Sequence, residues 1–211
     1  MIHELRIYTL KPGNVPAFLK LAEERALPIR GDNYGKMEGY WFSEFGALNQ
    51  IFHLWSFADL NTRAELRGAL GQLPEWRRDY VSQVQPLIRH QQIRLMHPKL
   101  PLKPPAEPGN VYEYRCYQAA IGKAAGFIEA ICEAMPVREK YSQNVCLWHT
   151  EAGQPNEVSH LWVYKDLETR AKARAAATQD EDWRAFLGKG GAMLEEMHST
   201  LLMPAPFSPL R

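Results

Sequence analysis

Residues 49–67 read NQIFHLWSFADLNTRAELR, and residues 156–174 repeat the pattern as NEVSHLWVYKDLETRAKAR. Ten of these nineteen positions are identical, and both copies keep a histidine and a tryptophan two residues apart: His53 and Trp55, then His160 and Trp162. Self-similarity at a fixed separation indicates a repeated structural unit. The stretch therefore predicts a duplicated domain and raises the question of why this pair is kept twice.

The repeat extends over the whole chain. HELRIYTLKPG near the start matches VYEYRCYQAAIG, LPIR (27–30) matches MPVR (135–138), and LMHP (95–98) matches LLMP (201–204). The separation drifts only from 109 to 106 residues, so insertions and deletions are small. Five prolines between Pro98 and Pro108 predict a stiff, extended connection between the copies. We therefore divide the chain into a first repeat (1–97), a proline-rich linker (98–110) and a second repeat (111–211).

Each repeat shows the same order of predicted elements. Short β-branched or aromatic runs bounded by turn formers predict strands, and apolar residues at helical spacing predict helices. We expect Asn14 to cap the first helix, and Pro28 and Pro136 to end or kink the first helices. Asp59 and Asp166 are expected to cap the second helices, which should be broken near Pro74 and Gly188. The predicted strands are 3–10, the hairpin around GALNQ and 90–96 in the first repeat, and 111–118, the hairpin around AGQPN and 197–203 in the second; the second helical stretches are 60–87 and 167–195.

The resulting order, β-α-β-β-α-β twice, is that of the ferredoxin-like unit, an antiparallel sheet with helices on one face. The other face of each sheet carries too many apolar residues to remain in water. Two tandem units can cover each other by packing sheet against sheet. We therefore predict an α+β protein built as an intrachain dimeric α/β barrel.

Composition narrows the classes of partner and location. A net charge of +1 gives no general attraction to nucleic acid or to an anionic membrane, so neither partner is expected. Three cysteines without CxxC spacing favour reduced thiols, and the first residues are too polar for a signal peptide. With no apolar run of membrane-spanning length, the sequence predicts a soluble cytoplasmic protein.

Several motifs together resemble the NIPSNAP family. They are ELRIYTLKPG at the start, HLW followed by DL and an arginine, an acidic residue two positions before a tryptophan, and MPAPFSPL at the end. The resemblance covers both repeats. It implies a dimeric α+β barrel, related in shape to cofactor-free monooxygenases, chlorite-dismutase-like proteins and stress-response barrel proteins. The family has no generally established reaction, and its animal members are discussed as interaction proteins of mitochondria or vesicles.

The repeated histidines and tryptophans define the candidate site. Alternate residues of a strand share a face, so each pair lies on one row. The first strand of each repeat adds a second row: Glu4, Arg6 and Tyr8, or Glu113, Arg115 and Tyr117. These rows should meet in a pocket for a small aromatic or anionic ligand, or for an enol that reacts with oxygen. We expect His53 or His160 as the base, Arg6 or Arg115 as the anion-binding group, and Trp55 or Trp162 as an apolar wall.

The two copies are not expected to be equivalent. Phe52 before His53 becomes Ser159 before His160, so the more polar second repeat is our choice for an open pocket. His53 should then be mainly structural.

A structural alternative remains open for both repeats. Histidines between tryptophan and leucine on a strand often belong to a core, and Trp76 and Trp183 are expected to anchor the second helices. The whole protein would then be a non-catalytic scaffold that contacts a protein partner. A cavity along the rows favours the small-molecule function, and a filled interior favours the scaffold.

No cofactor or metal is predicted. The sequence has no GxGxxG, P-loop, GxSxG or HExxH motif. His90, His97 and His198 lack a clustered set of carboxylates or thiolates, and no histidine is singled out as a haem ligand. A homodimer is compatible with the sequence.

Overall fold

The computed structural model describes all residues 1–211 and contains the predicted order of elements twice. The first repeat consists of β1 (Ile2–Leu10), α1 (Val15–Leu21), η1 (Ala22–Ala26), α2 (Leu27–Arg30), β2 (Lys36–Phe45), β3 (Gln50–Phe57), α3 (Leu60–Gln72), η2 (Trp76–Val81), α4 (Ser82–Val84), η3 (Gln85–Leu87) and β4 (Ile88–Pro98). The second consists of β5 (Val111–Ala119), α5 (Ala124–Arg138), β6 (Gln143–Ala152), β7 (Glu157–Tyr164), α6 (Leu167–Ala177), α7 (Glu181–Gly191) and β8 (Leu194–Pro204).

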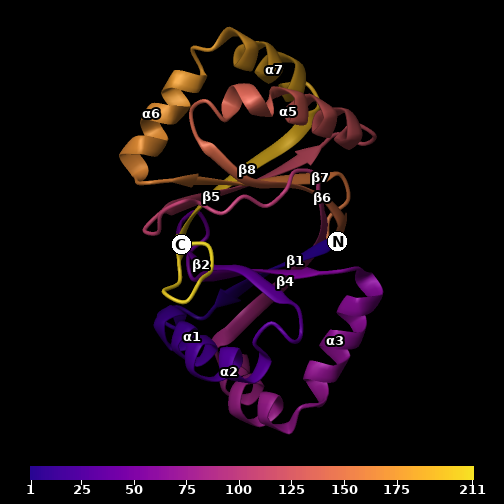
Figure 1. The fold of residues 1–211 in the computed structure, drawn as a ribbon, viewed down its shortest axis with the longest axis vertical. Helices are drawn as coiled ribbons and strands as arrows, with labels where there is room; N and C mark the ends of the chain where they lie inside the picture. The colour runs from indigo at the N-terminus through magenta and orange to yellow at the C-terminus, as the bar shows by residue number, and fades with distance from the viewer.

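The eight strands form one closed antiparallel barrel in the order β1-β3-β2-β8-β5-β7-β6-β4. Each repeat contributes a four-stranded sheet, and β2 pairs with β8 while β4 pairs with β6 to join the two sheets. Helices lie on the two outer sides of the barrel, with α5, α6 and α7 on one side and α1, α2 and α3 on the other (Figure 1). The prediction of two ferredoxin-like units packed sheet to sheet within one chain is confirmed.

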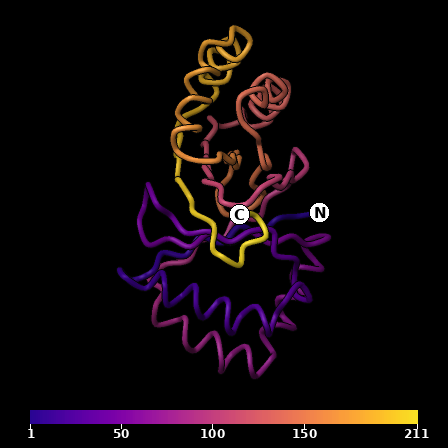
Figure 2. Tube along the Cα trace, turned by 60° about the vertical axis from the view of Figure 1, so that its left-hand side comes forward, coloured from indigo at the N-terminus to yellow at the C-terminus, as the bar shows by residue number.

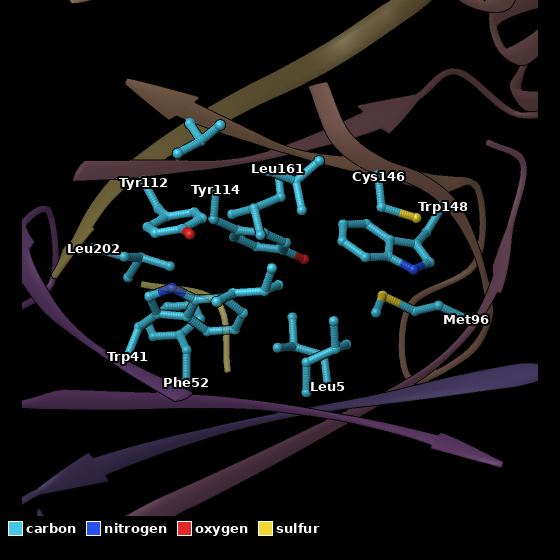
Figure 3. Packing of buried hydrophobic residues seen from close by; sticks show 14 of the residues in the cluster. Leu5, Trp41, Phe52, Met96, Tyr112, Tyr114, Cys146, Trp148, Leu161 and Leu202 are labelled. Carbon is cyan, nitrogen blue, oxygen red and sulfur yellow. The ribbon is translucent and has the colours of Figure 1, made fainter. Parts of the chain in front are cut away.

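The barrel interior is an apolar core shared by both repeats. Figure 3 shows Trp41, Phe52 and Leu5 of the first repeat facing Tyr112, Tyr114 and Leu161 of the second. Phe52 alternates along β3 with His53, so the histidine side of each sheet faces the helices instead of the barrel interior. The core thus fixes which face carries the candidate site.

The helices explain two of the small changes in repeat spacing. From Phe18 to Arg30 the first repeat has one residue more than the second has from Phe127 to Arg138 (12 against 11 positions). From Trp76 to the start of β4 at Ile88 there are 12 positions, and from Trp183 to the start of β8 at Leu194 there are 11, so the first repeat again has one residue more. Both segments contain π-helix, at η1 and η2, and the second repeat has none there. A π-helical turn accommodates one inserted residue without shifting the flanking helix.

Two of the three predicted helix caps are present. Asp59 and Asp166 accept hydrogen bonds from the backbone N–H groups of Thr62 and Thr169, so these caps are confirmed. Asn14 precedes α1, but its side chain makes no capping bond.

The break expected near Gly188 is wrong, because α7 continues through that glycine to Gly191. The chain instead breaks before α7, where the Asp180 carboxylate accepts from the N–H groups of Asp182 and Trp183. A carboxylate cap of this kind decides the start of a helix more strongly than one interior glycine decides its end. The first repeat breaks after Gln72, next to Pro74 as expected.

Each hairpin turns on an asparagine in the left-handed region. Asn49 and Asn156 both have φ of 58°, a conformation that asparagine tolerates better than most residues. This explains why the repeat keeps an asparagine at the start of the stretch that opened the sequence.

The linker lies along the second repeat, and the C-terminal segment lies along the first repeat. Lys99 N–H donates to the carbonyl of Leu147 on β6, and Ala205 N–H donates to the carbonyl of Tyr40 on β2. Figure 2 shows the yellow C-terminal segment reaching from the second repeat to the first. No helix is long and apolar enough to cross a membrane.

Candidate functional site

The repeated histidine and tryptophan form a hydrogen-bonded pair in each half. The indole N–H of Trp55 donates to His53 Nδ1 at 2.6 Å, and that of Trp162 donates to His160 Nδ1 at 2.5 Å. Because Nδ1 accepts, the proton of each neutral ring is placed on Nε2, which has no partner among protein atoms. The same indole-to-imidazole hydrogen bond in both halves gives a physical reason for each repeat to keep both residues.

This geometry changes the role expected for the histidines. Burial, and then the charge of a neighbouring arginine, Arg6 or Arg115, holds the pKa of His53 and of His160 well below the usual range. A neutral ring whose free nitrogen already carries a proton donates a hydrogen bond and does not accept a proton there. This arrangement favours a hydrogen-bond donor at each free Nε2, and a general base at His53 or His160 stays a prediction from the sequence.

An arginine that the sequence analysis did not assign lies over each tryptophan. The guanidinium carbon of Arg30 is 3.3 Å from the Trp55 ring centroid, and that of Arg138 is 4.7 Å from the Trp162 ring centroid. Both are buried, and both end the matching segments LPIR and MPVR. The arginine shared by these two segments was the available signal in the sequence, and cation–π contact with the repeated tryptophan is its physical reason.

The carboxylate of Glu113 is engaged by the protein itself. Arg170 donates to both of its oxygens, at 3.0 and 2.8 Å, and Ser199 donates at 2.7 Å. Burial alone would raise the pKa of Glu113, but these bonds and the charges of Arg115 and Arg174 lower it to about 2. Glu113 is fully buried and does not line the cavity described below, so it positions arginines instead of facing a ligand.

A cavity of about 230 Å³ lies in the second half, between the outer face of its sheet and the helices α5, α6 and α7. Four residues singled out from the sequence line it: Arg115, Tyr117, His160 and Trp162. The other lining residues are Phe127, Ile131, Arg138, Tyr164, Arg174, Ala177, Thr178, Trp183, Phe186, Leu187, Gly190, Gly191, Leu194 and Met197. Leu187 and Met197 are exposed, which places an opening between α7 and β8.

The corresponding space of the first half holds an aromatic side chain. Tyr40 on β2 pairs with His53 across the sheet, and its ring stacks on the imidazole with centroids 5.0 Å apart and planes 18° apart. Phe207 from the C-terminal segment packs against Tyr40 at 4.9 Å. The residue that pairs with His160 in the second half is Leu147, which has no ring.

The arginines on the two central strands are also engaged differently. Arg6 donates through Nε to Glu4 at 2.6 Å and through a terminal nitrogen to the Tyr8 hydroxyl. Arg115 donates to Glu113 at 3.2 Å, and its buried Nε has no partner. In the first half Arg6 is thus bonded to Glu4 and Tyr8, and Trp55 is bonded to His53.

Charge in the cavity is positive. Three arginines line it, Arg115, Arg138 and Arg174, and no carboxylate is among the lining residues. All three arginines contribute to the low pKa of His160, after the larger effect of burial. The cavity therefore favours an anionic or strongly hydrogen-bond-accepting molecule.

The structure shows no comparable site for metal binding or for a reactive thiol. No group of three or more histidine, cysteine or acidic residues is placed to hold a metal ion. His97 and His198 each lie beside one exposed glutamate, Glu151 and Glu196. Burial raises the pKa of the Cys116 and Cys146 thiols to about 12, which suppresses the reactive thiolate.

A family model described as NIPSNAP matches residues 3–101 and 112–209. The human protein named Protein NipSnap homolog 3B is 31% identical over 214 residues, covering 99% of this chain and 85% of its own. Protein NipSnap homolog of Dictyostelium discoideum is 28% identical over 211 residues, covering 96% and 87%.

Among solved structures, an anthrone oxidase-like protein aligns with a TM-score of 0.66 at 12% identity, covering 97% of this chain and 93% of its own. A candidate monooxygenase from Lactobacillus acidophilus aligns with a TM-score of 0.69 at 13% identity, covering 96% and 92%. At such low identities these likenesses concern the fold alone.

Proposed function

The chain belongs to the NIPSNAP family, and we propose that its second half binds a small planar anion in the cavity beside His160. The observation that carries this proposal is a cavity lined by three arginines and no carboxylate. Arg115 and Arg174 pair with Glu113, but the buried Arg138 has no acidic partner, its bonds going to Ser142 and Tyr164, and this favours a ligand that brings negative charge. The counterpart space in the first half is filled by Tyr40, so we expect one ligand per chain.

The size and walls of the cavity support a single substituted ring. An apolar cavity of roughly 150 Å³ is large enough for benzene, and this one measures about 230 Å³. Aromatic side chains such as Tyr117, Phe127 and Trp183 form much of its wall and suit contact with a ring. The exposed residues Leu187 and Met197 provide an apolar entrance.

The proposed roles follow from charge and hydrogen bonding. Arg138 and Arg174 attract the anionic group, and Arg115 offers its unpartnered Nε. His160 contributes a neutral ring and a free Nε2–H donor. Glu113 holds Arg115 and Arg170 in place without entering the cavity.

Cofactor-independent oxygenation is the catalytic form of this proposal. Positive side chains stabilise the ionised form of a bound enol or phenol, and the ionised form is richer in electrons and easier to oxidise. The neutral donor on His160 would stabilise the same negative oxygen. Binding of the anion can be measured in the absence of any such reaction.

The alternative, a non-catalytic scaffold for a protein partner, rests on a different observation. The barrel interior and the first half are both filled with side chains, as a structural protein requires. It gives no reason for a cavity with three arginines in its lining. Three free cysteines are in accord with a reducing compartment, so we propose a cytoplasmic location. We also propose no nucleic-acid or membrane partner, and we retain a homodimer as a form to test.

Titration with sodium benzoate tests the anion-binding function, with benzylamine as the oppositely charged control. We expect benzoate to bind with one site per chain and benzylamine to bind at least tenfold more weakly. Arg174→Gln should weaken benzoate about tenfold or more, because a hydrogen bond to a charged group contributes roughly 1.5–3 kcal/mol. The matched control is Arg67→Gln, which changes the corresponding arginine of the first half and should leave affinity unchanged. Equal binding of both probes, or equal loss in both variants, would contradict the proposal.

A further inference from the structure

The side chain of Tyr40 in the first half indicates which chemical group fits the cavity of the second half. We infer that the ligand of the second half is a monocyclic phenol whose ring lies on the His160 imidazole, as the phenol ring of Tyr40 lies on His53. This inference rests on the proposed function and specifies its substrate class. Tyr40 acts as a covalently attached stand-in for the ligand.

Strand register establishes the correspondence. Tyr40 is directly opposite His53 in the β2–β3 pair, and Leu147 is directly opposite His160 in the β6–β7 pair. Trp41 and Trp148 follow them, and both point into the barrel core. Tyr40 and Leu147 therefore occupy the same position on the same face of equivalent strands.

The surroundings of the Tyr40 ring correspond to lining residues of the cavity. Tyr8 makes an edge contact with His53, with centroids 4.8 Å apart, and Tyr117 makes the same contact with His160 at 4.8 Å. Tyr80 packs against Trp76 at 4.6 Å, as Phe186 packs against Trp183 at 4.8 Å. His160, Tyr117 and Phe186 all line the cavity.

The hydroxyl of Tyr40 and the hydroxyl of a phenol bound in the cavity would have different surroundings. Burial and the neighbouring phenols of Tyr80 and Tyr8 hold the pKa of Tyr40 well above its usual range, against the opposing charge of Arg30. In the second half Phe186 replaces Tyr80 and removes one of these phenols, while Arg138 replaces Arg30 and lines the cavity. A phenol bound there has its oxygen near guanidinium groups, which favour the phenolate over the neutral form.

The C-terminal segment strengthens the contrast. Phe207 covers Tyr40 in the first half, and the backbone N–H of Tyr40 donates to Ser208 Oγ at 2.9 Å. The linker runs along β6 in the same way, with Lys99 in the place of Ala205. By this match Pro101 stands where Phe207 stands, so the second half also lacks the second covering ring.

The test uses p-cresol, which has the structure of a tyrosine side chain, on the full chain. Binding is measured by calorimetry and by ligand-detected NMR, with toluene as the control without the hydroxyl and benzoate as the anion without a phenol. We expect p-cresol to bind at one site and at least tenfold more tightly than toluene. Its ultraviolet spectrum should shift toward that of the phenolate at a lower pH than in free solution.

Two variants locate the site. Leu147→Tyr places the first-half ring in the second half and should weaken p-cresol at least tenfold. Tyr40→Leu makes the reverse change and should raise the stoichiometry from one to two. If Leu147→Tyr fails to fold, Tyr40→Leu and the comparison of p-cresol with toluene still decide the inference.

The outcomes separate this inference from the function on which it rests. Benzoate binding without p-cresol binding would overturn the phenol class and leave anion binding intact. Failure of both probes would overturn both proposals. Binding of p-cresol that is unaffected by a folded Leu147→Tyr variant would place the phenol elsewhere and overturn the inference.

Discussion

The two halves of the barrel carry the same polar residues and put them to different use. Each has a histidine that accepts from a tryptophan, an arginine over that tryptophan, and a glutamate bound by arginines. In the first half Tyr40 stacks on the histidine and Phe207 packs against Tyr40, and in the second half the histidine, the tryptophan and the arginine line a cavity of about 230 Å³. The covering residues, and not the polar set itself, distinguish a packed half from a half with room for a ligand.

This difference follows naturally from duplication. Two fused copies need both sheets to close the barrel, so both retain the strands. Because only one half carries the cavity, the other half can bury a ring in its place, and this burial stabilises the folded state. The first half can thus stabilise the fold while the second keeps the space.

The largest expected contrast concerns the tryptophans of the second helical segments. Trp183 is buried against Phe186 and under Arg138, so Trp183→Ala should lower the free energy of unfolding by about 3 kcal/mol. Trp76 is only half-buried, and Trp76→Ala should cost roughly 2 kcal/mol or less. Denaturant unfolding of both variants measures the difference. A larger loss from Trp76→Ala would reverse the order of the two anchors.

Removal of the histidines should separate stability from binding. His53→Ala leaves the Trp55 indole N–H unsatisfied and removes the stacking partner of Tyr40, for a loss of about 2–3 kcal/mol. His160→Ala should cost about 1–2 kcal/mol, because water can enter the adjoining cavity and bond the Trp162 indole. It should also abolish benzoate binding, which His53→Ala should preserve. Thermal melts and ligand titrations decide this, and an unfolded His160→Ala would make that histidine structural.

Acid should destabilise both halves through the same kind of group. The unfolded chain protonates histidine near its ordinary pKa of 6.5, whereas burial keeps the pKa of His53 and His160 well below that value and lowers the pKa of His3 to about 4. The unfolded chain then binds more protons, so stability falls as pH drops below 6.5.

Each such histidine contributes a slope of about 1.4 kcal/mol per pH unit. His53→Asn and His160→Asn should each reduce the slope by that amount between pH 6 and 5, as urea unfolding at several pH values would show. A smaller reduction for His160→Asn would indicate that this ring already takes up a proton from water in the cavity. An unchanged slope in both would contradict their neutral state.

The smallest expected effect concerns a hydrogen bond that only the second half has. Ser199 donates to Glu113, and Ile93 stands at the matching position of the first half. Ser199→Ala should cost about 1 kcal/mol at neutral pH and should raise the pKa of Glu113 from its value of about 2. Carboxyl NMR titration measures the shift. A Glu113 pKa that stays unchanged would assign its stabilisation to the arginines alone.

The fold was predictable because the sequence patterns that indicate it are local and occur in both repeats. Alternating apolar residues gave the strands around His53 and His160, and the aspartates at 59 and 166 gave the starts of two helices. Gly188 misled the helix boundary because a single interior glycine is tolerated when packing favours the helix. The π-helical turns were visible only as one-residue changes in repeat spacing, which do not by themselves indicate where the extra residue lies.

The candidate site was predictable in its residues and not in its geometry. Strand alternation placed His160 and Trp162 on one face, but the direction of the indole hydrogen bond, which fixes the tautomer, needs coordinates. Arg138 was present in the repeated MPVR segment, yet its contact with Trp162 comes from the end of a helix distant in sequence. The effect of Leu147 in place of Tyr40 depends on strand register and on Phe207 folding back from the C-terminus.

A crystal structure of the protein soaked in sodium benzoate tests the central contrast most directly. We expect one benzoate per chain in the second half, with its carboxylate near Arg138 or Arg174, while Tyr40 remains stacked on His53 in the first. Benzoate in the first half in place of the Tyr40 ring, or a second half closed by Trp183 and Leu187 with no ligand, would contradict it.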